Sequence, residues 1–99
     1  MLPTHRRPTH PGKILAEEFL APLGISQAAL ARHLGIPLQR VNEIVRGKRG
    51  VSPETAWLLA GAFGTTPEFW LSLQTQHDLA AGRPKRAVRR IRSAPDPRA

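Results

Sequence analysis

The amino-acid sequence predicts an all-α protein built as a bundle of five short helices. Apolar residues recur at the three- and four-residue spacing of an amphipathic helix in five successive segments. Proline and glycine positions separate these segments, and no convincing stretch of alternating apolar and polar residues competes for a strand. Ninety-nine residues suffice for one domain with one core. We place that domain at residues 11–82, between an N-terminal arm at 1–10 and a basic tail at 83–99.

The first two helices have clear start and stop signals. A proline ring suits the first turn of a helix, so the first helix is expected to begin near Pro11 and to end at Pro22 and Gly24. Ser26 is the next cap, and its helix runs to Leu34. The expected core-facing residues of the first helix are Ile14, Leu15, Phe19 and Leu20.

The third helix is expected at about residues 37–46. Gly35 can adopt the left-handed conformation that turns the chain before it, and Pro37 opens the next helix. Val41, Ile44 and Val45 form its apolar side, and Gly47 ends it. Its other faces carry Leu38, Gln39, Arg40, Asn42, Glu43 and Arg46.

The last two helices repeat one opening pattern, a hydroxyl cap followed by proline. Ser52-Pro53 begins the fourth helix, which ends before Gly64, and Thr66-Pro67 begins the fifth, which fades near Ala81-Gly82. Their expected core residues are Ala56, Leu59, Ala60, Phe63, Phe69, Trp70 and Leu73. Trp57 lies off the apolar stripe of its helix, which makes it a candidate for an interface rather than the core.

Charge is distributed unevenly along the chain. Fifteen Lys and Arg residues against seven Asp and Glu give a net charge of +8, which favours polyanionic partners. Residues 26–50 and 83–99 are strongly basic, whereas residues 51–82 contain three acids and no Lys or Arg. The absence of cysteine excludes disulfides and thiolate metal sites. The longest mainly apolar run is too short to span a membrane, so we expect a cytoplasmic protein.

Residues 26–50 carry the main functional signal. Two short helices meet at a glycine, with the small Ala31 where they cross and polar groups on the N-terminal half of the second helix. That geometry lets a helix enter the major groove of DNA, and surrounding basic residues suit phosphates. A polar, basic helix face is often only solvated surface, but the glycine turn and the helix spacing favour the DNA-binding interpretation.

The same region resembles the Cro and phage-repressor, or lambda-repressor-like, helix-turn-helix domains, over about residues 11–75. The matching positions are Gln27, Leu30-Ala31, Leu34-Gly35, Val41, Ile44 and Gly47-Lys48. More narrowly, four separated motifs are similar to the HigA antitoxin family. These are residues 10–15 (HPGKIL), 40–45 (RVNEIV), 47–50 (GKRG) and 66–71 (TPEFWL). The tail after Gly82 lies outside that pattern, and Ile36-Pro37 replaces the family's usual capping side chain.

The resemblance implies a set of DNA contacts. Gln27 is expected to bind a phosphate together with helix-terminal amides. Leu38, Gln39 and Glu43 are expected to face base edges, and Arg40 to contact either bases or phosphates. Arg46, Lys48 and Arg49 are better placed for phosphates.

Partners follow from the same resemblance. One helix in one groove buries little surface, so we expect a homodimer that reads a palindromic operator in double-stranded DNA. HigA proteins repress their own operon and neutralise a HigB toxin, an mRNA-cleaving enzyme, and the acidic stretch at 51–82 offers a face for such a basic partner.

Catalysis and metal binding have little support in the sequence. Glu17 and Glu18 are adjacent on a helix and point apart, and the hydroxyl residues that open helices are explained as caps. His5 and His10 have no third ligand nearby, so we assign neither a metal nor another cofactor.

Two other functions remain open at this stage. A stand-alone transcriptional regulator without a toxin partner would use the same residues. A non-specific nucleic-acid-binding protein driven by the tail at 83–99 is favoured by the charge of the tail but disfavoured by an ordered recognition helix.

Overall fold

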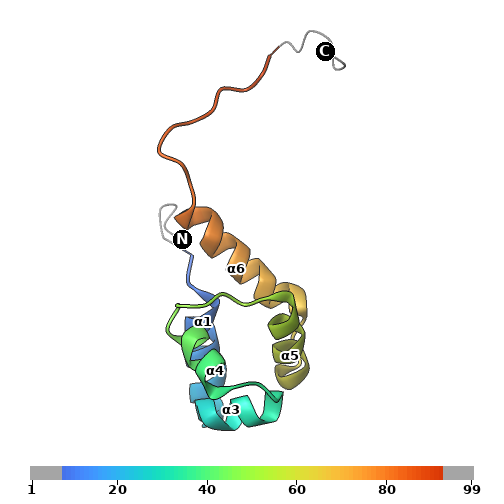
Figure 1. Cartoon of the computed structure of the whole chain (residues 1–99). Coiled ribbons are helices and arrows are strands. Elements are labelled where there is room, and N and C mark those ends of the chain that lie inside the picture. Colours follow the sequence, from blue (N-terminus) through green and yellow to red (C-terminus); the bar gives the residue numbers. More distant parts are fainter. Residues whose placement is uncertain (1–7, 93–99) are drawn as a thin grey trace.

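The computed structural model describes residues 8–92 and contains five helices and no strand in that range. The first helix has three labelled parts, α1 (Pro11–Ile14), η1 (Leu15–Leu20) and α2 (Ala21–Leu23). The others are α3 (Gln27–Leu34), α4 (Leu38–Val45), α5 (Pro53–Phe63) and α6 (Pro67–Ala81). In Figure 1 the first helix and α4 lie on one side, α5 lies opposite, and α3 crosses the end farthest from the C-terminus. The predicted five-helix bundle is confirmed.

The sequence suggested that the first helix ends at Pro22 and Gly24, but the helix does not stop at Pro22. It continues to Leu23 and ends only at Gly24, which has a φ of 65°. The reason is the wider turn of η1, in which the Ala21 amide donates to the Ala16 carbonyl five residues back. Such a π-helical turn relaxes the usual four-residue ladder, in which a proline lacks its donor and its ring clashes with a carbonyl. Pro22 is therefore accommodated within the helix.

The predicted caps open three helices. The side-chain oxygens of Ser26, Ser52 and Thr66 accept hydrogen bonds from the amides of Ala29, Thr55 and Phe69, at 3.0, 3.2 and 3.1 Å. Each bond satisfies an amide that has no partner within its helix. The helix starts predicted from hydroxyl residues are therefore confirmed.

One buried cluster joins all five helices. Its largest fully buried side chain is Trp70 on α6, whose indole nitrogen donates to the Thr65 hydroxyl at 2.8 Å. Phe19 packs against both Trp70 and Phe63, with ring centroids 5.1 and 4.9 Å apart. Phe69, expected in the core, instead lies at the edge of this cluster and is 38% exposed. The buried members are Leu15, Leu20, Leu30, Ala31, Val41, Ile44, Val51, Ala56, Leu59 and Trp70.

A close backbone contact fixes the first helix against α4. Gly12 is buried, and a methyl group added to it would overlap the carbonyl oxygen of Ile44. Only glycine lets the two backbones approach this closely. The position of α4 is thus set by backbone contact as well as by side-chain packing.

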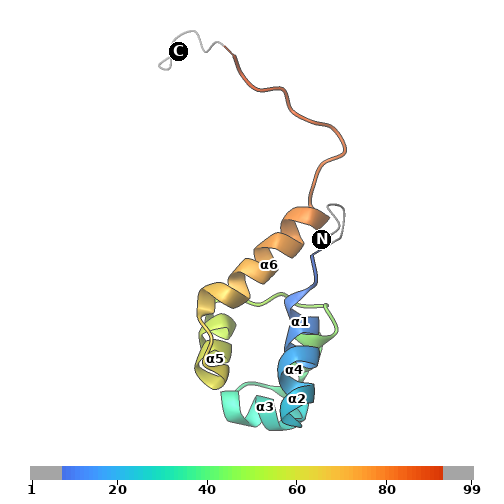
Figure 2. The ribbon, with the colours of Figure 1, turned by 180° about the vertical axis from the view of Figure 1, so that it is seen from behind.

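The C-terminal tail leaves the bundle after α6. Residues 83–92 are exposed throughout and have neither helix nor strand, and Figures 1 and 2 show this segment extending away from the helices. Residues 1–7 of the predicted arm, including His5, and residues 93–99 of the predicted tail lie outside the described residues.

No single helix within residues 8–92 is both long and apolar enough to cross a membrane. Taken together, the helices Pro11–Leu23 and Gln27–Leu34 reach the length and apolar composition of a membrane span, but they are bent by 99° relative to each other.

Candidate nucleic-acid interface

The outer face of α4 is the candidate binding surface. Val41 and Ile44 are buried, each 1% exposed, so the opposite face of this helix points outward. Leu38 at its first turn is 50% exposed. Gln39 and Arg46 are also exposed, whereas Arg40 and Glu43 are partly buried. The structure therefore brings the residues predicted to face base edges onto one helix.

The turn before α4 is built on Gly35. Its φ is 72°, and the amides of Gly35 and Ile36 donate to the Arg32 and Ala31 carbonyls at 3.3 and 3.1 Å. This pair of bonds is the Schellman arrangement that closes a helix end. Pro37 precedes α4 without a side-chain cap hydrogen bond. The predicted glycine turn is confirmed, and α4 begins one residue later than expected.

Glu43 lies between two other residues of the candidate surface. Its Oε1 accepts from Arg49 Nε at 2.9 Å, and its Oε2 accepts a longer bond from Gln39 Nε2 at 3.5 Å. The partial neutralisation by Arg49 reduces the repulsion that a lone carboxylate would meet near phosphates. The carboxylate of Glu43 is also held in a defined position on the outer face of α4.

Gln27 is tied to α4 through a residue that sequence reasoning did not select. Asn42 Nδ2 donates to Gln27 Oε1 at 3.2 Å, linking the first residue of α3 to the middle of α4. With the carbonyl oxygen engaged, the Nε2 donors of Gln27 are the groups suited to an anion. Asn42 therefore acts as a positioning residue. The signals in the sequence were its polar character on this helix and its place in the RVNEIV motif.

Arg40 points toward α5 rather than directly away from the bundle. Its guanidinium forms an ion pair with Glu54 at 3.2 Å, and the Glu54 side chain is 74% exposed. Such an exposed pair contributes little to stability and exchanges readily. Fourteen residues separate the partners in sequence, so no local pattern could reveal their contact.

A loop with the basic residues Lys48 and Arg49, here called the basic loop, follows the C-terminal end of α4. Gly47 has a φ of 73°, its amide donates to Ile44, and the Lys48 amide donates to the Glu43 carbonyl at 2.8 Å. These two bonds form a second Schellman arrangement. It fixes the chain direction after the helix, so that Lys48 and Arg49 follow directly from the recognition helix. Both residues are exposed.

A histidine pair joins this end of α4 to α6. A methyl group on Gly47 would lie 3.8 Å from the His10 ring, which stacks edge-on against His77 with 4.8 Å between centroids. His10 Nδ1 also accepts the Gly12 amide at 2.9 Å, so the neutral ring caps α1. Burial, together with the charge of His77, lowers the pKa of His10 below 6.5, against a smaller opposing effect of Asp78.

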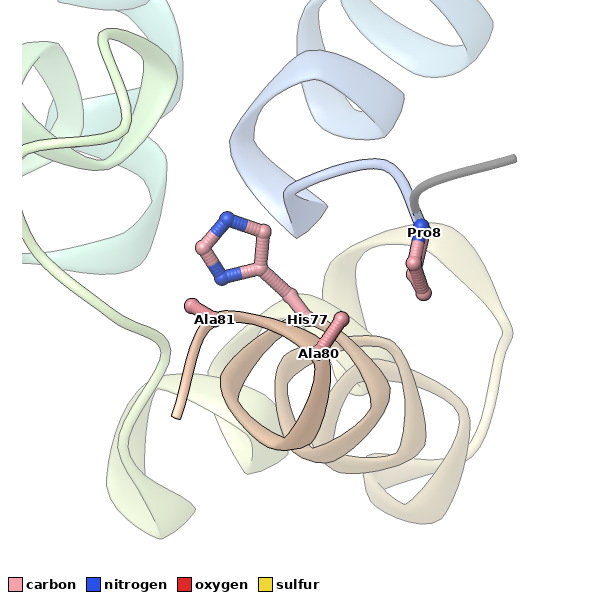
Figure 3. Close-up of a pocket in the computed structure, with 4 residues that line it drawn as sticks. All are labelled: Pro8, His77, Ala80 and Ala81. Carbon is pink, nitrogen blue, oxygen red and sulfur yellow. The ribbon is translucent and has the colours of Figure 1, made fainter. Parts of the chain in front are cut away.

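Beside the histidine pair is a small pocket of about 260 Å³. Figure 3 shows its four lining residues, Pro8 from the N-terminal segment and His77, Ala80 and Ala81 from the end of α6. Hydrogen bonds from Gln74 and His77 lower the pKa of Asp78. Within residues 8–92, no group of three or more His, Asp or Glu side chains is arranged to hold a metal ion. The pocket marks the place where the N-terminal segment meets the root of the tail.

Comparisons with known proteins agree with this geometry. Residues 17–70 match the helix-turn-helix family. The chain is 43% identical over 79 residues to antitoxin HigA-1 of Vibrio cholerae, which covers 80% of this chain and 74% of that protein. A solved structure of the Pseudomonas aeruginosa antitoxin HigA with the higBA promoter is 48% identical, with a TM-score of 0.74, and the match covers 76% of this chain and 82% of that one.

A third relative differs in length. The chain is 49% identical over 70 residues to virulence-associated protein I of Dichelobacter nodosus, a match that covers 71% of this chain. It spans only 65% of that relative's own length.

Proposed function

We propose, since this chain belongs to the helix-turn-helix family and within it to the HigA antitoxins, that it represses its own operon and neutralises a HigB-like toxin. The family is one of DNA-binding proteins and not of enzymes. The observation that carries the repressor part is the outer face of α4, whose polar side chains stand on a helix fixed by Gly12 and by two glycine turns.

The chemistry of the side chains on the outer face of α4 supports direct readout. A glutamine at position 39 can pair with adenine through two hydrogen bonds, and a glutamate at position 43 can accept from the amino group of cytosine. Leu38 supplies an apolar contact for a thymine methyl group. Arg40 can exchange Glu54 for guanine or a phosphate without a large loss of stability. Sequence preference thus comes from the first two turns of α4.

Phosphate contacts position that helix in the groove. The side-chain amide of Gln27 and the first-turn amides of α3 can bind one phosphate, because a helix N-terminus attracts anions. Arg46, Lys48 and Arg49 surround the other end of α4 and are all exposed. These contacts set the register on the duplex but carry no sequence information.

A homodimer would place two α4 helices on a palindrome. One helix buries too little surface for strong specificity, and half-sites one helical turn apart require a second copy. The 68% exposure of Trp57 on α5 supports this proposal, because a large aromatic side chain in water is typical of an interface. Replacing Trp57 by Lys should shift the chain toward monomer in sedimentation experiments and weaken operator binding.

Toxin binding is the second part of the proposed function. Glu54, Glu68 and Asp78 are exposed on α5 and α6, and no Lys or Arg occurs between residues 51 and 82. Exposed acidic side chains on helices that lack Lys and Arg favour a basic protein partner over DNA. Such a chain would act in the cytoplasm, where operon and toxin both occur.

Co-expression with the product of the neighbouring gene tests this part. We expect a stable complex and rescue of the growth arrest that the toxin causes alone. If there is neither complex nor rescue, while operator binding persists, the chain is a stand-alone transcriptional regulator.

A further inference from the structure

We propose that residues 83–92 bind the phosphate backbone of duplex DNA outside the half-site that α4 reads. This inference rests on the proposed operator binding and adds to it a second DNA-contacting surface with a different task. The tail supplies affinity without sequence preference, and it extends the footprint of the protein along the flanking DNA.

The charge of this segment is the first observation. Six of its ten residues are basic and none is acidic. Every residue is exposed, and none takes part in the ion pairs that the structure contains within residues 8–92. The basic residues are Arg83, Lys85, Arg86, Arg89, Arg90 and Arg92. A segment with this much unpaired positive charge is not suited to burial in the core, and it favours a polyanionic partner.

The position of the tail's root is the second observation. The tail leaves α6 four residues after Asp78, and His77 on that last stretch packs against His10. His10 in turn lies against Gly47, which ends α4 and precedes the basic loop. Figures 1 and 3 show the same junction, with the end of α6 next to the segment that enters α1. The tail therefore starts at the end of the molecule where Lys48 and Arg49 lie.

The length of the segment fits a track along one strand. Ten extended residues span about 33 Å, close to the rise of one turn of B-form DNA, about 34 Å. The phosphates of one strand recur about every 3.4 Å along the axis, so several basic side chains can each meet one. Fixed side-chain geometry is unnecessary for this task, because phosphates are the same at every step.

Binding to duplexes with and without flanking DNA tests the proposal. The probe is a duplex selected from random DNA by the full chain, with or without about ten additional base pairs on each side. The variant replaces the six basic residues between positions 83 and 92 by Gln, and the control replaces Val88 and Ile91 by Ser, which keeps the charge. Fluorescence anisotropy over a salt series gives the affinity and its salt dependence.

We expect the full chain to bind the flanked duplex more tightly than the short one. The six-Gln variant should lose that advantage, and the slope of log K against log salt should fall by about 5, or 0.9 for each lost phosphate contact. Its preference for the selected sequence over a scrambled one should be unchanged. The Val88 and Ile91 control should behave like the full chain.

An unchanged slope in the six-Gln variant would overturn the proposal. Equal losses on short and flanked duplexes would also overturn it, because the charges would then act within the half-site. Tighter, tail-dependent binding to single-stranded RNA or to phosphatidylserine vesicles at the same salt would assign the tail to another partner. If no sequence is preferred over scrambled DNA, the proposed operator function fails. A slope that still falls in the six-Gln variant would then support phosphate binding by the tail, and its placement outside a half-site would be overturned.

Discussion

Helix α4 and residues 83–92 are both polar. Basic residues lie next to α4 and within residues 83–92, but the two regions are built in opposite ways. Helix α4 is held by buried Val41 and Ile44, by the backbone contact at Gly12, and by glycine turns at both ends. Residues 83–92 are exposed throughout and have no regular structure. Fixed side chains can distinguish bases, whereas charge on an extended segment recognises only the phosphate backbone. In the proposed function, this contrast assigns specificity to α4 and additional affinity to residues 83–92.

Adding a methyl group at Gly12 should have the largest effect on the region that contains α4. In Gly12→Ala the new methyl group overlaps the Ile44 carbonyl oxygen, which forces the first helix away from α4. We expect the free energy of unfolding to fall by about 3 kcal/mol in urea titrations. Gly61→Ala is the matched control, since its methyl group meets nothing within 4 Å. It should stabilise α5 by up to about 1 kcal/mol. Equal stabilities of the two variants would remove the proposed contact.

Straining the turn before α4 comes next. Gly35 has a φ of 72°, a conformation that a β-branched side chain strongly disfavours. Gly35→Val should therefore lower the free energy of unfolding by about 2 kcal/mol in thermal denaturation. Gly35→Asn should lose less, because asparagine tolerates the left-handed region. A Val variant as heat-stable as its parent would contradict the turn.

The junction between the two regions should respond to pH. Since the folded-state pKa of His10 lies below 6.5, the folded chain binds fewer protons there than the unfolded chain does. The contribution of the neutral His10 side chain to stability is complete above pH 6.5 and decreases as the pH falls toward the lowered pKa. His10→Asn keeps a cap but cannot titrate, so its unfolding should depend less on pH in that range. His77 and Asp78 both act on His10 and are present in both proteins, so only the difference between the two proteins reports on His10.

Removing the tail should have the smallest effect on folding. Deleting residues 83–99 removes only exposed side chains within the described part of the chain. We expect the free energy of unfolding to change by less than about 0.5 kcal/mol, measured by urea titration. A larger loss would mean that the tail packs on the bundle, and the contrast between the two regions would disappear.

Local signals predicted most of the fold. Hydroxyl caps, prolines at first turns and glycines at helix ends act within a few residues, so they are legible in sequence. Of the two stop signals expected for the first helix, Gly24 is confirmed, whereas Pro22 does not stop the helix because a π-helical turn accommodates the ring. Phe69 also lies farther out than its spacing suggested, whereas the neighbouring Trp70 is fully buried.

The candidate surface was predictable in its location but not in its internal contacts. The outer face of α4 followed from helical periodicity around Val41 and Ile44. The pairs Gln27 with Asn42 and Arg40 with Glu54 join residues 15 and 14 positions apart. Only the crossing of helices brings them together. The contact between Gly12 and Ile44 could not be predicted for the same reason, because the sequence does not show which backbone lies against a glycine inside a helix.

The most direct test of the account is the sequence preference of α4 itself. DNA selected from random sequence at one stated salt concentration should be compared for the parent chain, Gln39→Ala, Glu43→Ala and Lys48→Ala. We expect the first two variants to lose about 1–3 kcal/mol of discrimination, each at its own operator position. Lys48→Ala should weaken binding to all sequences alike. If both Gln39→Ala and Glu43→Ala select the parental operator with unchanged affinity, α4 does not read the bases.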